Sequence, residues 1–274
     1  MKYLYIFVTS DRPDQYLNPI VHCILYERVN KIIFVRVQRS QSKTTELNLK
    51  SKVYQLLQNL SEGNYKYYTG ELRGEIFKLS YEYNDNHLEL LKKTYRSCLR
   101  DEIDWTGQDI QYLALRDYIS HLSEKKDIIV DVTSASKSYL SDILACSLLE
   151  SIEGLYAFEL IGKPPNYDKP WTTLIHELDK TIIPELHEDA KEQTSYEYIN
   201  LIETPIFKEG RKSILIRTTP LFISIIGTLL FVLITLAATF ILGFSSIFVQ
   251  IVSLLGAVLG ITSFFLIYFP LRVK

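Results

Sequence analysis

A cluster of hydroxyl groups and one lysine follows a short apolar segment in the middle of the chain. The segment 128–133 has the composition of a buried strand; it ends in Thr133, and Ser134, Ser136 and Lys137 follow it. Apolar residues at helical spacing begin immediately afterwards. A strand that turns into a helix directs free backbone N–H groups and the positive end of the helix dipole above the sheet edge. This arrangement predicts a phosphate-binding site.

The same residues have two other interpretations. Thr133 or Ser134 would serve as an ordinary N-cap, and Lys137 as a solvated residue of the first helical turn. The order Ser134-Ala-Ser-Lys137 also fits the Ser-x-x-Lys pair of penicillin-binding enzymes. The Lys-Thr-Gly partner of that pair does not occur in the sequence, so we do not favour acyl-transfer chemistry.

The elements that must position these residues alternate between strands and helices. An apolar strand at 2–9 ends in Thr9 and Ser10, and helical and strand patterns then follow each other along the chain. This alternation predicts an α/β fold, a Rossmann-like three-layer sandwich with a mostly parallel sheet. We expect strands at 31–38, 65–68, 128–133, 154–160, 171–178 and 196–202, with a helix over 108–123. In a parallel sheet the carboxyl ends of the strands share one edge, so Thr9 and Ser10 should lie beside 133–137, with the loop at 162–165 as a third candidate contributor.

The cysteines and histidines give no sign of a metal centre or a disulfide framework. The three cysteines are far apart, and the five histidines have no metal-ligand spacing with one another or with cysteine. We expect buried free thiols in a reducing compartment and no bound metal.

Charge divides the chain into two parts. No Asp, Glu, Lys, Arg or His occurs between Arg217 and Arg272. We expect two transmembrane spans there, at about 220–242 and 247–269, each long enough to cross about 30 Å of hydrocarbon. Basic flanking residues would place the soluble part and the C-terminus in the cytoplasm, at the cell inner membrane. The predicted domains are 1–178, a connector at 179–217 and a hairpin at 218–271.

The charged part of the chain does not favour duplex nucleic acid as a partner. Without Arg272 and Lys274 the basic residues fall from 30 to 28 against 32 acidic ones, so this part has a net charge near −4. Proteins that bind duplex nucleic acid typically carry a basic surface. An anionic ligand must therefore be held by a local site.

The stretch Asp131-Val-Thr133-Ser-Ala-Ser-Lys137 resembles the Asp/Asn-x-Thr-x-x-x-Lys signature of CARF domains, the CRISPR-associated Rossmann-fold sensors of cyclic oligoadenylates. The resemblance covers about residues 1–178. It implies a homodimer, or a higher homo-oligomer, that binds one cyclic oligoadenylate, with the tetra-adenylate ring favoured and no further cofactor. The residues that it assigns to ligand binding are Thr9, Ser10, Thr133, Ser134, Ala135, Ser136 and Lys137.

A CARF domain joined to a membrane hairpin is similar to the membrane effectors of type III CRISPR systems. The resemblance implies antiviral defence in which ligand binding switches the hairpins and depolarises or permeabilises the lipid bilayer. Two alternatives remain open. One is a membrane-anchored ring nuclease that slowly cleaves its own ligand without metal, and the other is a membrane-anchored module that recruits a partner. We therefore predict a binding protein and leave enzymatic activity undecided.

Overall fold

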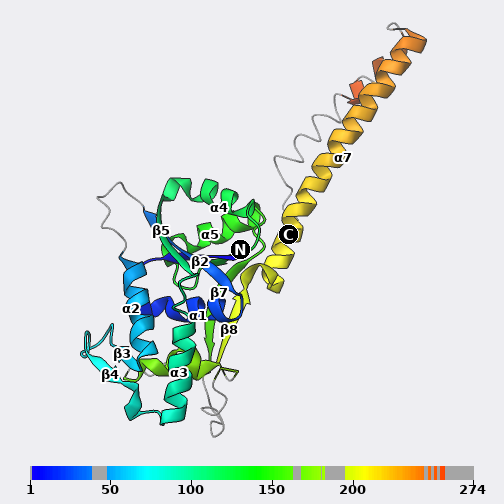
Figure 1. Ribbon diagram of the computed structural model, residues 1–274. Helices are drawn as coiled ribbons and strands as arrows, with labels where there is room; N and C mark the ends of the chain where they lie inside the picture. Colours follow the sequence, from blue (N-terminus) through cyan, green and yellow to red (C-terminus); the bar gives the residue numbers. More distant parts are fainter. Residues whose placement is uncertain are drawn as a thin grey trace. The chain divides into compact units, whose positions relative to one another are not determined.

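The computed structural model describes residues 2–38, 48–162, 168–179, 181–182, 195–243, 246–247, 250–251 and 254–256. For residues 210–225, 238 and 242 it describes the backbone alone. The chain divides into two compact units, Met1–Thr204 and Pro205–Lys274 (Figure 1). The first unit contains the predicted ligand site.

A six-stranded sheet forms the centre of the first unit, with the strand order β5-β2-β1-β6-β7-β8. The strands are β1 (Lys2–Val8), β2 (Val29–Gln38), β5 (Asp104–Gln111), β6 (Ile128–Asp131), β7 (Leu155–Ile161) and β8 (Ser195–Asn200). All neighbouring pairs are parallel except β7 and β8, which are antiparallel. The predicted mostly parallel, Rossmann-like α/β sheet is therefore confirmed.

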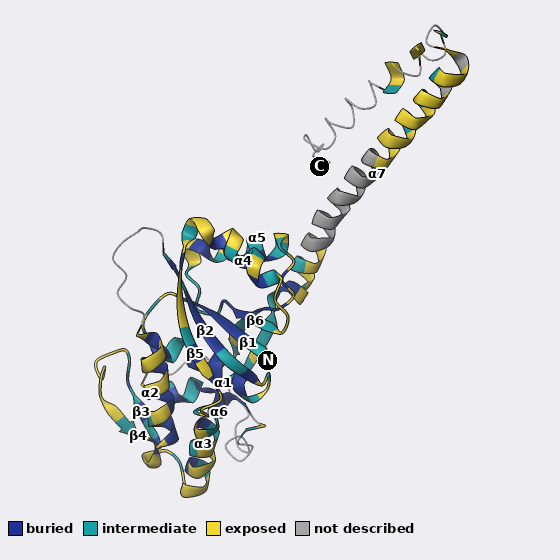
Figure 2. Ribbon diagram, turned by 45° about the horizontal axis from the view of Figure 1, so that its top comes forward, coloured by how far each residue is buried: buried dark blue, intermediate teal, exposed yellow. Residues whose placement is uncertain are grey.

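Both faces of the sheet are covered, which explains why β1 is a continuous apolar run. Leu4, Ile6 and Val8 belong to one buried core, and Tyr5 and Phe7 belong to the other. Figure 2 shows the helices on the two sides of the sheet. The first core lies under α1 (Leu17–Leu25), α2 (Leu49–Ser61) and α3 (Asp85–Ser97), and the second under α4 (Leu115–Ser123) and α5 (Lys137–Leu149).

The strand order places a topological switch point between β1 and β6. The chain moves outward from β1 to β2 and β5, and then returns to the other side of β1 to form β6, β7 and β8. In open α/β sheets the connections on the two sides of such a point leave the sheet in opposite directions, and the place where they diverge, outside the carboxyl ends of the strands, is the crevice of the fold. Ligands of open α/β sheets bind at this place.

Two segments differ from the secondary structure that the sequence predicts. Residues 108–111 continue edge strand β5, whereas the predicted helix begins only later, at Leu115. Much of β5 is exposed and polar, so it lacks the apolar run of a central strand. Residues 171–178 form a short 3₁₀ turn and α6 (Ile175–Leu178) in place of a strand. A small hairpin, β3 (Asn64–Lys66) with β4 (Ile76–Lys78), lies outside the main sheet.

The predicted two-helix transmembrane hairpin is wrong. Over the described ranges, no helix combines the length and the apolar character that a membrane span needs. The first predicted span is the second half of α7 (Pro205–Leu242), which starts well before Pro220 and includes Lys208, Glu209 and Arg217. The absence of charged residues from a segment describes its composition only. It does not determine the residues at which a helix begins and ends. Most of the second predicted span, 247–269, lies outside the described residues.

Helix α7 carries many apolar side chains that are exposed. They include Ile226, Leu229, Leu230, Leu233, Leu236 and Phe240. An exposed apolar surface of this kind is uncommon on a folded chain, and nothing in the described part of the structure shows what covers it.

Candidate functional site

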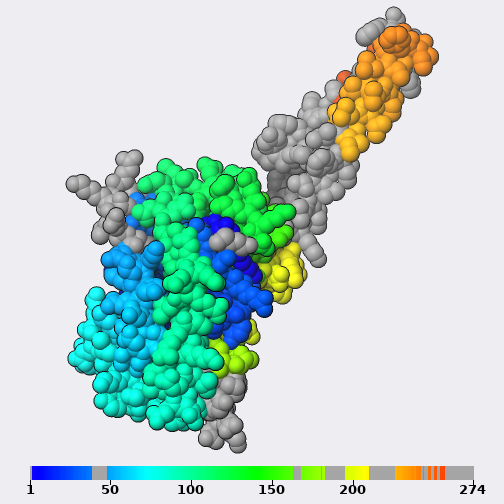
Figure 3. Space-filling view, in the orientation of Figure 1, coloured from blue at the N-terminus to red at the C-terminus, as the bar shows by residue number. Residues whose placement is uncertain are grey.

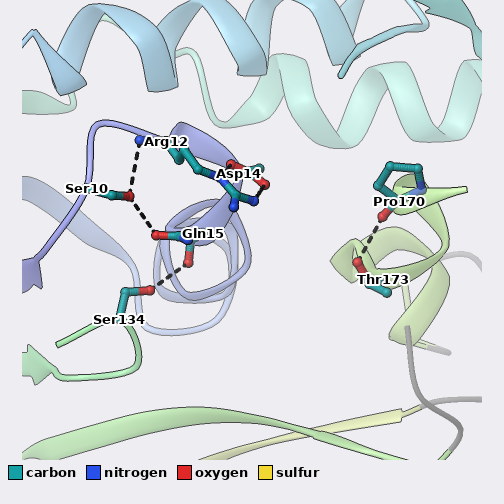
Figure 4. A network of polar contacts seen from close by, with 7 residues as sticks. All are labelled: Ser10, Arg12, Asp14, Gln15, Ser134, Pro170 and Thr173. Atoms are coloured by element: carbon teal, nitrogen blue, oxygen red, sulfur yellow. Dashed lines mark hydrogen bonds and ion pairs between the residues drawn. The ribbon is translucent and has the colours of Figure 1, made fainter. Parts of the chain in front are cut away.

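The loops after β1 and β6 meet at the switch point and are joined by two hydrogen bonds. The Thr9 hydroxyl donates to the carbonyl oxygen of Ser134 over 3.0 Å. The Ser134 hydroxyl donates to the carbonyl oxygen of Gln15 over 3.1 Å (Figure 4). The sequence predicts that these two loops share an edge of the sheet, and the structure brings Thr9 and Ser134 into direct contact.

Tyr16 holds the loop after β1 from below. Its hydroxyl accepts hydrogen bonds from the backbone N–H groups of Thr9 (3.1 Å) and Ser10 (3.0 Å), and it donates to the Ser10 carbonyl over 2.9 Å. The Tyr16 side chain is fully buried, so this anchor is fixed by the core. The Ser10 hydroxyl donates to the Gln15 side chain over 2.7 Å. The loop therefore offers a ligand the Thr9 side chain, which is exposed, rather than these two amides.

A buried carboxylate organises the turn after β6. Asp131 has no exposed surface and accepts hydrogen bonds from the Thr133 N–H (3.1 Å), the Thr133 hydroxyl (2.9 Å) and the Tyr198 hydroxyl (3.0 Å). An aspartate that accepts from a backbone amide two residues later is a common device for fixing a turn. The Thr133 hydroxyl also accepts the Phe158 N–H over 2.8 Å, which connects the turn to β7.

Burial controls the titration of Asp131. Desolvation raises the pKa of this carboxyl to about 7, while the hydrogen bonds from Thr133 and Tyr198 act in the opposite direction. Three donors stabilise the charged form, but they do not offset the loss of water around a fully buried charge. Asp131 therefore changes its charge near neutral pH beneath the loop that carries the ligand candidates.

The start of α5 presents a positive charge and helix-start amides at the same place. Ser136 is the N-cap, and its hydroxyl accepts the Ser138 N–H over 3.4 Å. Lys137 is the first residue of α5 and is exposed, with no ion pair to any residue that the structure describes. The Ala135 N–H donates to Val132 over 3.0 Å and so closes the turn. A helix N-terminus with an adjacent lysine favours an anionic group.

The structure divides the seven predicted ligand residues into two roles. Thr9 and Lys137 have exposed side chains, and the Thr9 hydroxyl also donates to the Ser134 carbonyl. Thr133, Ser134, Ser10 and Ser136 are engaged in bonds that shape the loops. Ala135 contributes its backbone to the turn. The assignment of all seven to ligand contact stays a prediction.

Sequence patterns do not identify Tyr16, Gln15 or Tyr198, although each holds one of the loops. In the sequence, Tyr16 is visible only as an apolar helix position. Tyr198 lies 67 positions after Asp131, and its contact depends on the pairing of β8 with β7. Lys163, in the loop expected as a third contributor, lies outside the described residues.

Metal-ligating residues do not gather anywhere in the described ranges into a group of three or more. Cys23 and Cys98 are buried free thiols, and burial raises the pKa of both, so they remain protonated. The functional groups that converge on the crevice are hydroxyls, amides and an ammonium group. They are suited to binding an anionic, hydroxyl-bearing ligand.

Comparison with known proteins gives a narrow result. No protein-family profile matches the chain, and no curated protein sequence matches it. Among solved structures it is similar to Enterococcus italicus Csm6 bound to cyclic hexa-2'-fluoro-hexa-dAMP, with 9% sequence identity and a TM-score of 0.35. The match covers 97% of this chain and 54% of that one, so this chain spans about half the length of that protein.

Proposed function

We propose that the crevice between β1 and β6 binds a cyclic oligoadenylate and that the protein is a sensor in CRISPR-based defence. The observation that carries this proposal is the hydrogen bond from Thr9 to Ser134, at the switch point and beside the start of α5. It joins the two loops into one surface. That surface includes Lys137, the last residue of the Asp131-x-Thr133-x-x-x-Lys137 motif.

The chemistry of the crevice fits the phosphates and ribose hydroxyls of an oligonucleotide. Lys137 and the amino end of α5 supply positive charge for a phosphate, and Thr9 supplies a hydroxyl at the facing loop. A ring of identical nucleotides is symmetric. Two copies of the same loop pair, related by a two-fold axis, would contact it equivalently, so we expect a homodimer around one ring.

Calorimetric titration of the full chain with cyclic tri-, tetra- and hexa-adenylate, and with linear oligoadenylate, tests the proposal. We expect one ring to bind at one per two chains and linear oligoadenylate to bind more weakly. Lys137→Ala should reduce the affinity by about 10- to 100-fold, as expected for a charged contact to phosphate. Lys126→Ala is the matched control, because Lys126 is exposed and lies before β6 instead of after it.

Two results would contradict the proposal. One is the absence of binding to every ring, and the other is equal loss of affinity in the Lys137 and Lys126 variants. The same titrations, followed by chromatography of the nucleotide, distinguish a sensor from a ring nuclease. A sensor returns the ring intact, whereas a nuclease returns linear products.

A further inference from the structure

A second polar groove opens on the far side of the loop that carries Thr9 and Ser10. It has a volume of about 390 Å³, within the range of roughly 300–1,000 Å³ that is usual for ligand pockets. Its walls come from residues 11–13, from the first turns of α2 and from the hairpin β3–β4. Figure 3 shows this hairpin at the surface of the unit, beside α2. The groove is thus separate from Lys137, which lies across the β1 loop at the start of α5.

The groove is strongly basic although the whole chain has a net charge of −2. Four cationic side chains line it, and Asp11 is the one acidic residue in its described lining. The cations and the two aromatic residues beside them are Arg12, Lys52, Lys66, Arg73, Tyr67 and Tyr68. The lining has a net charge of three, which the Asp14 partner of Arg12 reduces to two, and this local positive charge favours an anionic ligand.

Two of the four cations form no ion pair with a residue that the structure describes, although Arg73 is near enough to Asp11 to lower the pKa of that carboxyl. Lys66 and Arg73 form no ion pair within these ranges, whereas Arg12 pairs with Asp14 over 2.5 Å and Lys52 pairs with Asp11. The Asp11 carboxylate is 72% exposed, and a surface pair of this kind contributes only about 0–1 kcal/mol. An incoming phosphate can therefore recruit Lys52 at small cost, and it supplies Lys66 and Arg73 with a counter-charge.

Two tyrosines give the groove an aromatic surface, which a nucleobase can contact and inorganic phosphate cannot. Tyr68 is half-buried at the groove, and Tyr67 is held below it by a hydrogen bond from its hydroxyl to the Asp168 carbonyl over 3.3 Å. Aromatic faces beside a basic groove are the usual arrangement for holding a nucleobase next to its phosphate. Two backbone hydrogen bonds fix the hairpin end that carries the tyrosines: the Gly74 N–H donates to the Tyr67 carbonyl and the Tyr67 N–H donates to the Glu75 carbonyl, each over 2.9 Å.

We propose that this basic groove is a second ligand site, which binds the phosphate of a nucleotide through Lys66, Arg73 and Lys52 and its base against Tyr68. This inference rests on the charges and the shape of the groove, and it does not require a ligand in the crevice between β1 and β6. It shares one wall with that crevice, since the Arg12 N–H donates to the Ser10 hydroxyl over 3.3 Å (Figure 4).

Titration of the full chain with adenosine 5′-monophosphate and with inorganic phosphate tests the groove directly. The variant Lys66→Ala/Arg73→Ala removes both unpaired cations and should weaken binding of both probes by about tenfold or more. Lys93→Ala/Lys126→Ala is the matched control, because it removes the same charge from exposed positions outside the groove and its hairpin. Tyr68→Leu should weaken the nucleotide but not inorganic phosphate.

The outcomes separate this groove from the crevice. Nucleotide affinity that falls in the Lys66/Arg73 variant and persists in Lys137→Ala supports the proposal. No binding of either probe, unchanged affinity in the Lys66/Arg73 variant, or equal losses in it and in the Lys93/Lys126 variant would overturn it. If adenosine monophosphate fails to bind while a cyclic oligoadenylate still binds and depends on Lys137, the groove is rejected and the crevice retained.

Discussion

Tyr198 on β8 donates a hydrogen bond of 3.0 Å to the buried carboxylate of Asp131 at the end of β6, although β7 lies between these two strands. The same carboxylate accepts both the N–H and the hydroxyl of Thr133. One buried acid therefore connects the turn before α5 to the antiparallel edge of the sheet. The shape of the loops after β1 and β6 depends on this network as well as on the residues exposed on them.

The first prediction concerns the pH dependence of folding. Burial raises the pKa of Asp131 from 3.8 to about 7, so between these values the folded state binds a proton that the unfolded state has released. Stability from this group is therefore present at low pH and is lost as the pH rises toward 7. We expect the contribution of Asp131 to the free energy of unfolding to fall by about 2 kcal/mol between pH 5 and pH 7.

Urea unfolding of the wild type and of Asp131→Asn at both pH values measures this contribution. The asparagine does not titrate, so the difference between the two proteins isolates Asp131 from other titrating groups. His22 is one such group, because its pKa is lowered by burial. Equal pH dependence in the two proteins would show that Asp131 is ionised in the folded state throughout this range.

The second prediction concerns the tyrosine that donates to this carboxylate. Tyr198→Phe removes a hydrogen bond to a buried acid, and we expect a loss of about 1–3 kcal/mol of stability at pH 8. The loss should be smaller at pH 5, where Asp131 is protonated and needs fewer donors. Tyr54→Phe is the control, since Tyr54 is 44% exposed and should tolerate the change at both pH values. If Tyr198→Phe loses the same stability at pH 5 and at pH 8, the contribution of Tyr198 does not depend on the ionisation of Asp131.

The sequence predicts the central layer of this fold because the signal there is local. The segment 3–8 is a continuous apolar run, and the strand at Ile128–Asp131 is followed within two residues by a polar turn and then a helix. Parallel strands must then end at one edge, which is sufficient to bring Thr9 to Ser134. Both features follow from composition over a few residues and from the geometry of a parallel sheet.

Features that depend on distant partners were not predictable in the same way. Edge strand β5 carries Gln108 and Asp109 on exposed positions, so it has no apolar run. The roles of Tyr16 and Tyr198 depend on which loop or strand lies opposite each hydroxyl. The membrane prediction failed for a related reason, because it inferred helix limits from the absence of charge after Arg217.

The third prediction tests whether the start of α5 is held by its cap. Ser136→Ala removes the hydroxyl that accepts the Ser138 N–H, and we expect α5 to lose about 0.5–1 kcal/mol. Ser141→Ala is a control on the same helix: Ser141 is exposed in the helix interior, where alanine is favourable, so stability should stay equal or rise slightly. Thermal unfolding of both variants measures the difference. Equal stability of the two variants would contradict a capping role for Ser136.

The fourth prediction concerns the hydrogen bond that joins the two loops. Thr9→Val keeps the shape of the side chain and removes the hydroxyl that donates to Ser134. Because this bond is exposed, water can replace it, and the free energy of unfolding should change by less than about 1 kcal/mol. Binding of cyclic tetra-adenylate should weaken by about tenfold, since the ligand must then order the two loops itself.

Two further variants decide whether the hydroxyl of Thr9 is responsible. Thr9→Ser retains the donor and should bind the ring nearly as well as the wild type. Thr106→Val makes the same chemical change at a half-buried position on edge strand β5, away from the crevice, and should leave the affinity unchanged. If Thr9→Val binds the ring like the wild type, the loops are held by other contacts, of which the Ser134 bond to Gln15 is the strongest candidate. The double variant Thr9→Val/Ser134→Ala, which removes both bonds, would then be expected to lose the affinity that neither single change affects.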